Sequence, residues 1–162
     1  MSEILIRDII ETDNKALKIL VKTTLAEFGA QSTGCSSNDD EVNNMYQVYH
    51  QPNNFYFVVE KNNKILGGAG CVALKEHQNI KACELRKMYF SPQLRGLGIG
   101  KKLLDMCIKK AKKLGYNSIQ LETMPTMTSA QNLYTKTGFV KKIKNQQSHC
   151  NQACDIFMVK QI

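Results

Sequence analysis

The sequence predicts a mixed α/β domain, on three observations. Strand-like and helix-like segments alternate along the chain, with short turns rich in glycine, proline or asparagine between them. One continuous stretch, residues 83–114, has the pattern of a strand, a glycine turn and a long helix. The segment order is βααβββαβαββ, which builds a central mixed β-sheet flanked by helices. At 162 residues, without an internal repeat or linker, the chain is expected to be one domain, residues 1–162.

The strands are indicated by alternating apolar and polar residues or by runs of aromatic and β-branched residues. Strands are expected over residues 3–8, 55–61, 64–74, 83–90, 118–122 and 154–160, with one more following residues 138–140. The first has the pattern of an edge strand. The apolar phase of residues 83–90 slips after Leu85, as a β-bulge would cause. Asn62 and Asn63 make a tight turn between two strands, and residues 76–81 make another.

The helices are indicated by apolar residues three or four positions apart. They are expected between Asp13 and Gly29, over residues 40–49, from Gly100 to Gly115 and over residues 126–137. Thr12 or Asp13 can cap the first helix, and glycine ends the first and third helices. Residues 31–40 are polar and are expected to form a loop.

Residues 91–102 predict an anion-binding turn. Pro92 ends the preceding strand because proline cannot donate to a sheet ladder. The glycines at positions 96, 98 and 100 leave the backbone uncovered, and a helix begins at once. Free N–H groups and the helix dipole favour negative charge there, and Lys101 and Lys102 add positive charge. The ligand is therefore expected to carry phosphate.

Two familiar phosphate-binding loops do not fit this stretch. A P-loop requires Gly-Lys followed by serine or threonine, but Gly100-Lys101 is followed by Lys102. A dinucleotide-binding fingerprint requires a third glycine, and Leu103 stands in its place. The pattern that remains is [Q/R]-x-x-G-x-[G/A], which begins at Arg95.

This pattern resembles the coenzyme A pyrophosphate loop of the GNAT N-acetyltransferase superfamily. A second run, Ala130-x-x-Leu133-Tyr134-x-x-x-Gly138-Phe139, is similar to the conserved A-x-x-L-Y-x-x-x-G-F region of that family. The two regions cover about half of the chain. The resemblance implies the GNAT acyl-CoA N-acyltransferase fold and acetyl-CoA as the cosubstrate. It also implies direct acetyl transfer to a primary amine in a ternary complex, with a small molecule as the favoured acceptor.

The resemblance assigns cofactor contacts to the strand, the glycine turn and the later helix. The expected residues are Met88, Tyr89, Phe90, Arg95, Gly96, Leu97, Gly98, Ile99, Gly100, Lys101 and Asn132. The backbone of the first three is expected to pair with the pantetheine amides. Many family members carry an asparagine for the pantetheine arm where this chain has Met127, so that contact departs from the family pattern.

Two residues are candidate catalysts. Glu84 lies eleven residues before Arg95, the spacing that the family uses for a glutamate base, and it interrupts a strand expected to be mostly apolar. The alternative for Glu84 is a structural ion pair with Arg86 or Lys87. Tyr134 is the candidate acid, because its hydroxyl can protonate a departing thiolate. The alternative for Tyr134 is a core residue on an amphipathic helix.

The composition is compatible with other functions as well. The net charge of +8 is compatible with nucleic acid, but no nucleic-acid motif accompanies it, and coenzyme A is itself a polyanion. A protein lysine or N-terminal acetyltransferase and a non-catalytic acyl-CoA-binding or nucleic-acid-binding module remain alternatives. The chain shows no evident signal peptide or membrane span, so a cytoplasmic protein, monomeric or homodimeric, is expected.

The cysteines and the acceptor pocket are less informative. Six cysteines without a secretory signal are expected to be reduced thiols. His149, Cys150 and Cys154 lack a second ligand pair, so no metal site is expected, and whether they have any role stays open. The acceptor pocket is expected to draw on residues 28–37, 40–49 and 145–153.

Overall fold

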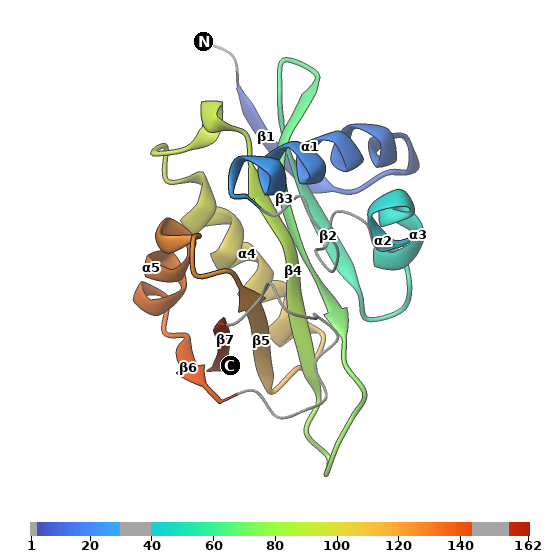
Figure 1. Cartoon of the computed structure of the whole chain (residues 1–162). Coiled ribbons are helices and arrows are strands. Elements are labelled where there is room, and N and C mark those ends of the chain that lie inside the picture. Colours follow the sequence, from blue (N-terminus) through green and yellow to red (C-terminus); the bar gives the residue numbers. More distant parts are fainter. Residues whose placement is uncertain (1–2, 30–39, 144–155) are drawn as a thin grey trace.

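In the computed structural model the chain forms one seven-stranded sheet with helices on both faces (Figure 1). The structure describes residues 3–29, 40–143 and 156–162. The sheet order is β1-β2-β3-β4-β5-β7-β6, and β4–β5 is its parallel pair among antiparallel neighbours. The strands are β1 (Ile4–Asp8), β2 (Phe55–Lys61), β3 (Lys64–Ala73), β4 (Ala82–Phe90), β5 (Ser118–Thr123), β6 (Val140–Lys142) and β7 (Ile156–Gln161). This mixed sheet confirms the predicted fold class.

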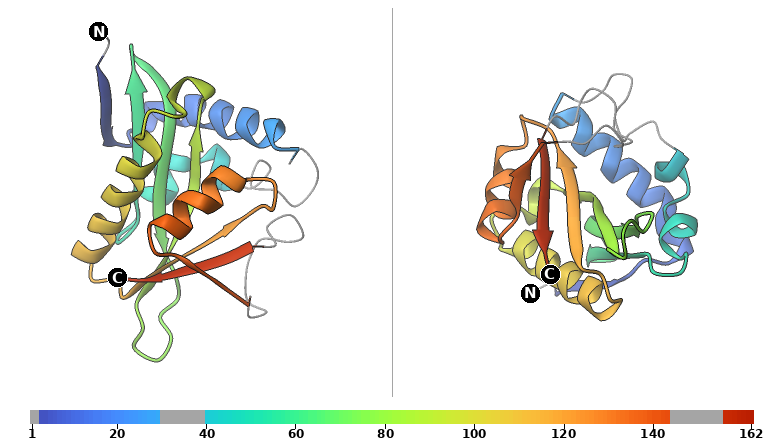
Figure 2. Two further views of the ribbon diagram at one scale, coloured as in Figure 1. Left: turned by 90° about the vertical axis from the view of Figure 1, so that its left-hand side faces the viewer. Right: turned by 90° about the horizontal axis from the view of Figure 1, so that it is seen from below.

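The helices are divided between the two faces of the sheet (Figures 1 and 2). They are α1 (Asn14–Glu27), α2 (Asp40–Asn43), α3 (Met45–Tyr49), α4 (Ile99–Lys113) and α5 (Thr128–Lys136), with 3-10 turns at Glu11–Asp13 and Pro92–Leu94. The buried side chains of α4 and α5 pack with Leu85 and Ile119 in one core. Those of α1 and α3 pack with Tyr56 and Val58 in a second core on the other face. Each face of the sheet is therefore covered by hydrophobic packing.

The turns confirm the sequence predictions made from glycine and asparagine. Asn62 and Asn63 have φ angles of 51° and 59°, the left-handed pair that a primed hairpin turn requires. Gly29 and Gly115 have φ angles of 77° and 82°, and they follow the ends of α1 and α4. β1 is an edge strand of the sheet, as predicted.

The predicted bulge lies in β4. Gly68 pairs with Tyr89 and Gly70 with Arg86, so one β3 residue opposes two β4 residues. Lys87, one of those two, has a φ of 51°. The Tyr56 hydroxyl, on β2, donates a 2.7 Å hydrogen bond to the Lys87 carbonyl on β4, across the intervening strand β3. This bond anchors the bulge, which shifts the face to which later side chains of β4 point.

Two helix predictions were wrong in detail. Asp13 stands at the N-cap position of α1, but its side chain does not cap the helix: the carboxylate accepts hydrogen bonds from Arg7 at 2.8 and 3.0 Å and from the Ile10 N–H at 2.9 Å. The helix expected over residues 40–49 is two short helices, because the chain leaves helical geometry at Asn44. Asn14 accepts the Tyr46 N–H at 2.7 Å and so caps α3 from another helix. Both outcomes depend on partners from other segments, which local patterns do not reveal.

The described cysteines are Cys71, Cys83 and Cys107, and all three are buried free thiols. Over residues 3–29, 40–143 and 156–162, no helix has the length and apolar character needed to cross a bilayer. His149, Cys150 and Cys154, and residues 30–37 and 145–153 of the predicted acceptor pocket, lie outside the described residues.

Candidate functional site

The site lies where β4 and β5 separate. Their parallel ladder joins residues 82–84 to residues 118–120 and ends there. β4 continues beside β3 as far as Phe90, while β5 continues beside β7 as far as Thr123. A pocket of about 490 Å³ lies beyond the end of the ladder.

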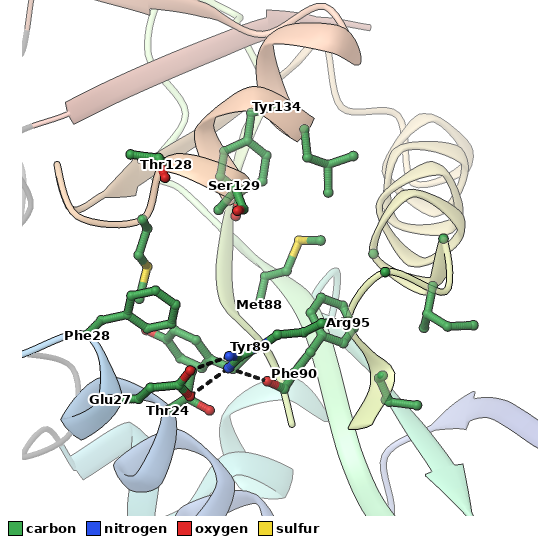
Figure 3. Close-up of a pocket in the computed structure, with 18 residues that line it drawn as sticks. Thr24, Glu27, Phe28, Met88, Tyr89, Phe90, Arg95, Thr128, Ser129 and Tyr134 are labelled. Carbon is green, nitrogen blue, oxygen red and sulfur yellow. Dashed lines mark hydrogen bonds and ion pairs between the residues drawn. The ribbon is translucent and has the colours of Figure 1, made fainter. Parts of the chain in front are cut away.

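Five segments contribute side chains to the pocket (Figure 3). They are the end of α1, the end of β4, the turn before α4, the start of α4, and α5 together with the residue before it. The lining residues are Thr24, Glu27, Phe28, Met88, Tyr89, Phe90, Leu94, Arg95, Gly96, Gly98, Ile99, Gly100, Met127, Thr128, Ser129, Ala130, Leu133 and Tyr134. In Figure 3, Tyr134 and Ser129 lie on one side of Met88 and the Glu27–Arg95 pair on the other.

The turn before α4 has the geometry of an anion site. Gly96 and Gly98 have φ angles of 74° and 73°, where a side chain would strain the backbone. The Lys102 N–H bonds to the Gly98 carbonyl at 3.1 Å, so the first three amides of α4 have no acceptor within the helix. A Cβ on Gly100 would lie 3.3 Å from Leu133, against the opposite wall. The turn thus offers open backbone donors beside a tightly packed wall.

Tyr134 lies on α5 and is buried, with 6% of the residue exposed. The ring packs against Phe139 at a centroid distance of 5.8 Å, and it also lines the pocket. Burial raises the pKa of the Tyr134 hydroxyl well above its usual value, with a smaller contribution from Cys107. Among the described residues the Tyr134 hydroxyl forms no hydrogen bond, and no fully buried side-chain oxygen lacks a partner, so this hydroxyl is open to the pocket. Tyr134 therefore presents a neutral proton donor at the pocket.

Arg95 and Glu27 form an ion pair between the glycine turn and the end of α1. Arg95 Nη2 lies 2.7 Å from Glu27 Oε2, and Nη1 pairs with Oε1. Arg95 Nη2 also donates to the Phe90 carbonyl at 3.0 Å, and its guanidinium lies 5.6 Å from the ring centroid of Phe28. The hydrogen bonds from Arg95 lower the pKa of Glu27. The pair is thus charged on both sides at neutral pH.

Glu84 does not line the pocket. Its carboxylate accepts Arg86 Nη2 at 2.5 Å and Arg86 Nε at 2.7 Å. Arg86 Nη1 lies 3.1 Å from Glu41, whose other oxygen accepts the Tyr49 hydroxyl at 2.5 Å. Burial opposes the charge of Arg86, but the two carboxylates outweigh it and raise the pKa of the guanidinium. Glu84 therefore belongs to a chain of four polar side chains, which continues through Arg86 to Glu41 on α2 and Tyr49 on α3.

Comparison with known proteins decides the family. The model of the acetyltransferase (GNAT) family matches residues 22–139. The chain belongs to the GNAT family. It is 37% identical over 128 residues to the uncharacterized N-acetyltransferase YjgM of Escherichia coli, covering 78% of this chain and 76% of that one. It is 34% identical to an uncharacterized N-acetyltransferase of Schizosaccharomyces pombe, over 75% and 73% of the two chains. As a GNAT protein, the chain is an acyltransferase enzyme.

Solved structures agree with this fold. A GNAT acetyltransferase of Staphylococcus aureus superposes with a TM-score of 0.83 at 23% identity, over 98% of this chain and 99% of that one. The protein yncA of Salmonella typhimurium, solved with its cofactor acetyl-CoA, gives 0.76 at 18% identity, over 98% and 93%. The mixed sheet flanked by helices is therefore the GNAT fold, as the sequence predicted.

The GNAT pocket brings together most of the residues that the sequence singled out. Nine of them line it: Met88, Tyr89, Phe90, Arg95, Gly96, Gly98, Ile99, Gly100 and Tyr134. Glu84, Leu97, Lys101 and Asn132 are not among the lining residues. Leu97 is 55% exposed, Lys101 pairs with Asp105 at 2.6 Å, and Asn132 is exposed on α5.

Sequence reasoning missed two parts of the GNAT pocket. Thr24 and Glu27 come from the last turn of α1, far from both matched motifs, and only tertiary packing brings them there. Phe28, which follows them, lies within the range 28–37 that was expected to contribute to the acceptor pocket. Thr128 and Ser129 come from the first turn of α5. The sequence could have predicted these two, because they are hydroxyl residues at the start of the helix that carries Tyr134 and can therefore face the same pocket.

Proposed function

We propose that this GNAT enzyme transfers an acetyl group from acetyl-CoA to a primary amine of a small molecule, directly in a ternary complex. The observation that carries the proposal is the pocket at the β4–β5 separation, which joins open α4 amides at one side to the Tyr134 hydroxyl at the other. A diphosphate suits the amides and the helix dipole. A thioester suits the apolar wall that Met88 and Leu133 provide.

The residues present fit this cosubstrate. The α4 amides behind Gly98 would hold the diphosphate, and the end of β4, no longer paired with β5, would accompany the pantetheine arm. The backbone N–H of Met88 would face the thioester oxygen as it becomes negative. Acetyl-CoA would supply the activated acyl carbon.

The chemistry assigned to this chain is two proton transfers. The amine nitrogen forms a bond to the acyl carbon, and the carbon–sulfur bond breaks. Tyr134 gives its proton to the departing thiolate, which leaves as the free thiol. Glu84 accepts the proton lost by the amine through an intervening water, because its carboxylate lies outside the pocket lining. Tyr134 and Glu84 then exchange these protons with solvent, so no charge accumulates.

An amine panel tests the function. Acetyl-CoA is incubated with the protein and small primary amines, amino acids, a lysine peptide and a peptide with a free N-terminus. We expect acetylated product by mass spectrometry and matching coenzyme A release for at least one small amine. Acetylation of the peptides alone would move the acceptor class to proteins. Tight coenzyme A binding without any acetylated product would contradict the proposed activity.

A further inference from the structure

Glu27 is an unexpected residue in this pocket. The pocket is proposed to receive a polyanion, yet a carboxylate is one of its lining residues. Among the 18 described lining residues, Glu27 and Arg95 carry the opposite charges, so the lining has no net charge from its Asp, Glu, Lys and Arg side chains. The one cation of the lining is thus neutralised before any ligand arrives.

The contacts of Arg95 show what holds it. Both terminal nitrogens face the two oxygens of Glu27, which is the bidentate arrangement that guanidinium also makes with phosphate. One of them bonds to the Phe90 carbonyl as well, and the guanidinium lies over the Phe28 ring. A phosphate that engages Nη1 and Nη2 of Arg95 must displace the carboxylate, because the two anions require the same two donors.

We propose that Glu27 is a positioning residue that competes with the diphosphate of the cosubstrate for Arg95. The carboxylate holds Arg95 across the pocket in the free enzyme and gives it up when diphosphate binds. Glu27 thereby weakens the binding of coenzyme A and speeds its release as product, while Arg95 stays ordered between turnovers. The inference rests on the proposed use of coenzyme A.

The exposure of the pair makes this exchange feasible. The side chains of Arg95 and Glu27 are 37% and 40% exposed, so either partner can be hydrated while the other is engaged. Exposed ion pairs contribute little to stability, and breaking this one leaves no buried charge. Glu27 can therefore be replaced without unfolding the protein.

Calorimetry on the full chain tests the competition. Coenzyme A is titrated into the wild type, Glu27→Gln and the matched control Glu76→Gln, which removes the same charge from an exposed turn outside the pocket. We expect Glu27→Gln to bind coenzyme A about two- to fivefold more tightly, and the control to bind it as the wild type does. The gain should shrink at high salt, because the competing charges are exposed.

Two further titrations separate competition from other effects. Pantetheine lacks the diphosphate, so its affinity should be equal in wild type and Glu27→Gln. In an Arg95→Gln background, Glu27→Gln should give no gain, because the shared partner is gone.

Each contrary result has a distinct meaning. Equal or weaker coenzyme A binding by Glu27→Gln would overturn the competition. A full gain in the Arg95→Gln background would show simple charge repulsion and also overturn it. Failure of the wild type to bind coenzyme A would contradict the proposed function itself.

Discussion

Tyr134 combines a buried ring with a hydroxyl that no described side chain engages. Tyr134→Phe keeps the ring and its packing on Phe139 and deletes the oxygen. If the hydroxyl protonates the thiolate, the single-turnover rate should fall by about 10²-fold or more, while coenzyme A affinity changes little. Because burial raises its pKa, Tyr134 should remain an acid throughout the ordinary assay range. Single-turnover acetylation with a panel amine measures this.

The assay must be limited by chemistry, since slow product release would hide the effect. The control is the free energy of unfolding, which should be close to that of the wild type because no described hydrogen bond is lost. A normal single-turnover rate in Tyr134→Phe would assign the residue to the core alone.

Glu84 has two alternative roles, general base or structural residue, and its ion pair with Arg86 already provides the structural one. Glu41 provides a matched control: it pairs with the same guanidinium from the other side. If Glu84 is the base, Glu84→Gln should lower the rate by about 10²- to 10⁴-fold at neutral pH, with a smaller defect at high pH, where the amine loses its proton unaided. Glu41→Gln should have no such pH-dependent defect. Equal pH–rate profiles for the two variants would remove Glu84 from the mechanism.

At the scale of elements, α4 provides its own comparison, because a left-handed glycine lies at each end. Gly98 has a φ of 73° in the pocket and Gly115 a φ of 82° at the far end. An alanine meets open space or ordinary contact at either position, so each substitution should cost about 1–2 kcal/mol of stability through backbone strain alone. Only Gly98→Ala changes the direction of the amides that face the pocket.

We therefore expect Gly98→Ala to weaken coenzyme A binding by about tenfold or more, and Gly115→Ala to bind normally. Calorimetry measures the affinity, and urea unfolding confirms that the two variants lose similar stability. Equal coenzyme A affinity in both variants would contradict the assignment of the glycine turn to the diphosphate.

The elements that the sequence predicted well are those fixed by neighbouring residues. Asn62-Asn63 and Gly115 adopt left-handed geometry that few other residues tolerate, so their turns could be read locally. The bulge in β4 was visible in the slipped apolar phase around Lys87. The break at Asn44 was not predictable, because Asn14, 32 residues away from Tyr46, supplies the cap for α3.

At the scale of the whole molecule, some residues of the candidate site could be predicted from short motifs, and others depend on distant parts of the chain. The glycine turn and Tyr134 belong to short motifs whose spacing alone indicates their chemistry. Glu27 is 68 residues from Arg95 in the chain and meets it only because α1 packs across the sheet from α4. The periodic pattern of apolar residues predicts that Glu27 lies on a helix, but it does not predict that Glu27 contacts Arg95 in the glycine turn. Contacts of this kind require the folded structure.

Burial of weak acids throughout the molecule also has a consequence for stability. Burial raises the pKa values of Tyr49, Tyr56, Tyr134, Cys71 and Cys107, and it raises the pKa of Tyr116 to about 12. In the unfolded chain thiols ionise near pH ~8.5 and phenols near pH ~10. Above those values the folded state binds more protons than the unfolded state, so the free energy of unfolding must fall as pH rises.

We expect the free energy of unfolding to decrease from about pH 9 and more steeply above about pH 10. Each buried group contributes about 1.4 kcal/mol per pH unit until its own folded pKa is reached. Urea unfolding across this range measures the slope. Tyr134→Phe removes one of the ionising groups. It should therefore reduce the slope of the free energy of unfolding against pH by the contribution of one group, about 1.4 kcal/mol per pH unit. Ile119→Val, in the same core, should cost about 0.5–1.5 kcal/mol at every pH and leave the slope unchanged. A pH-independent free energy of unfolding up to about pH 11 would mean that these phenols and thiols ionise alike in the folded and unfolded chains.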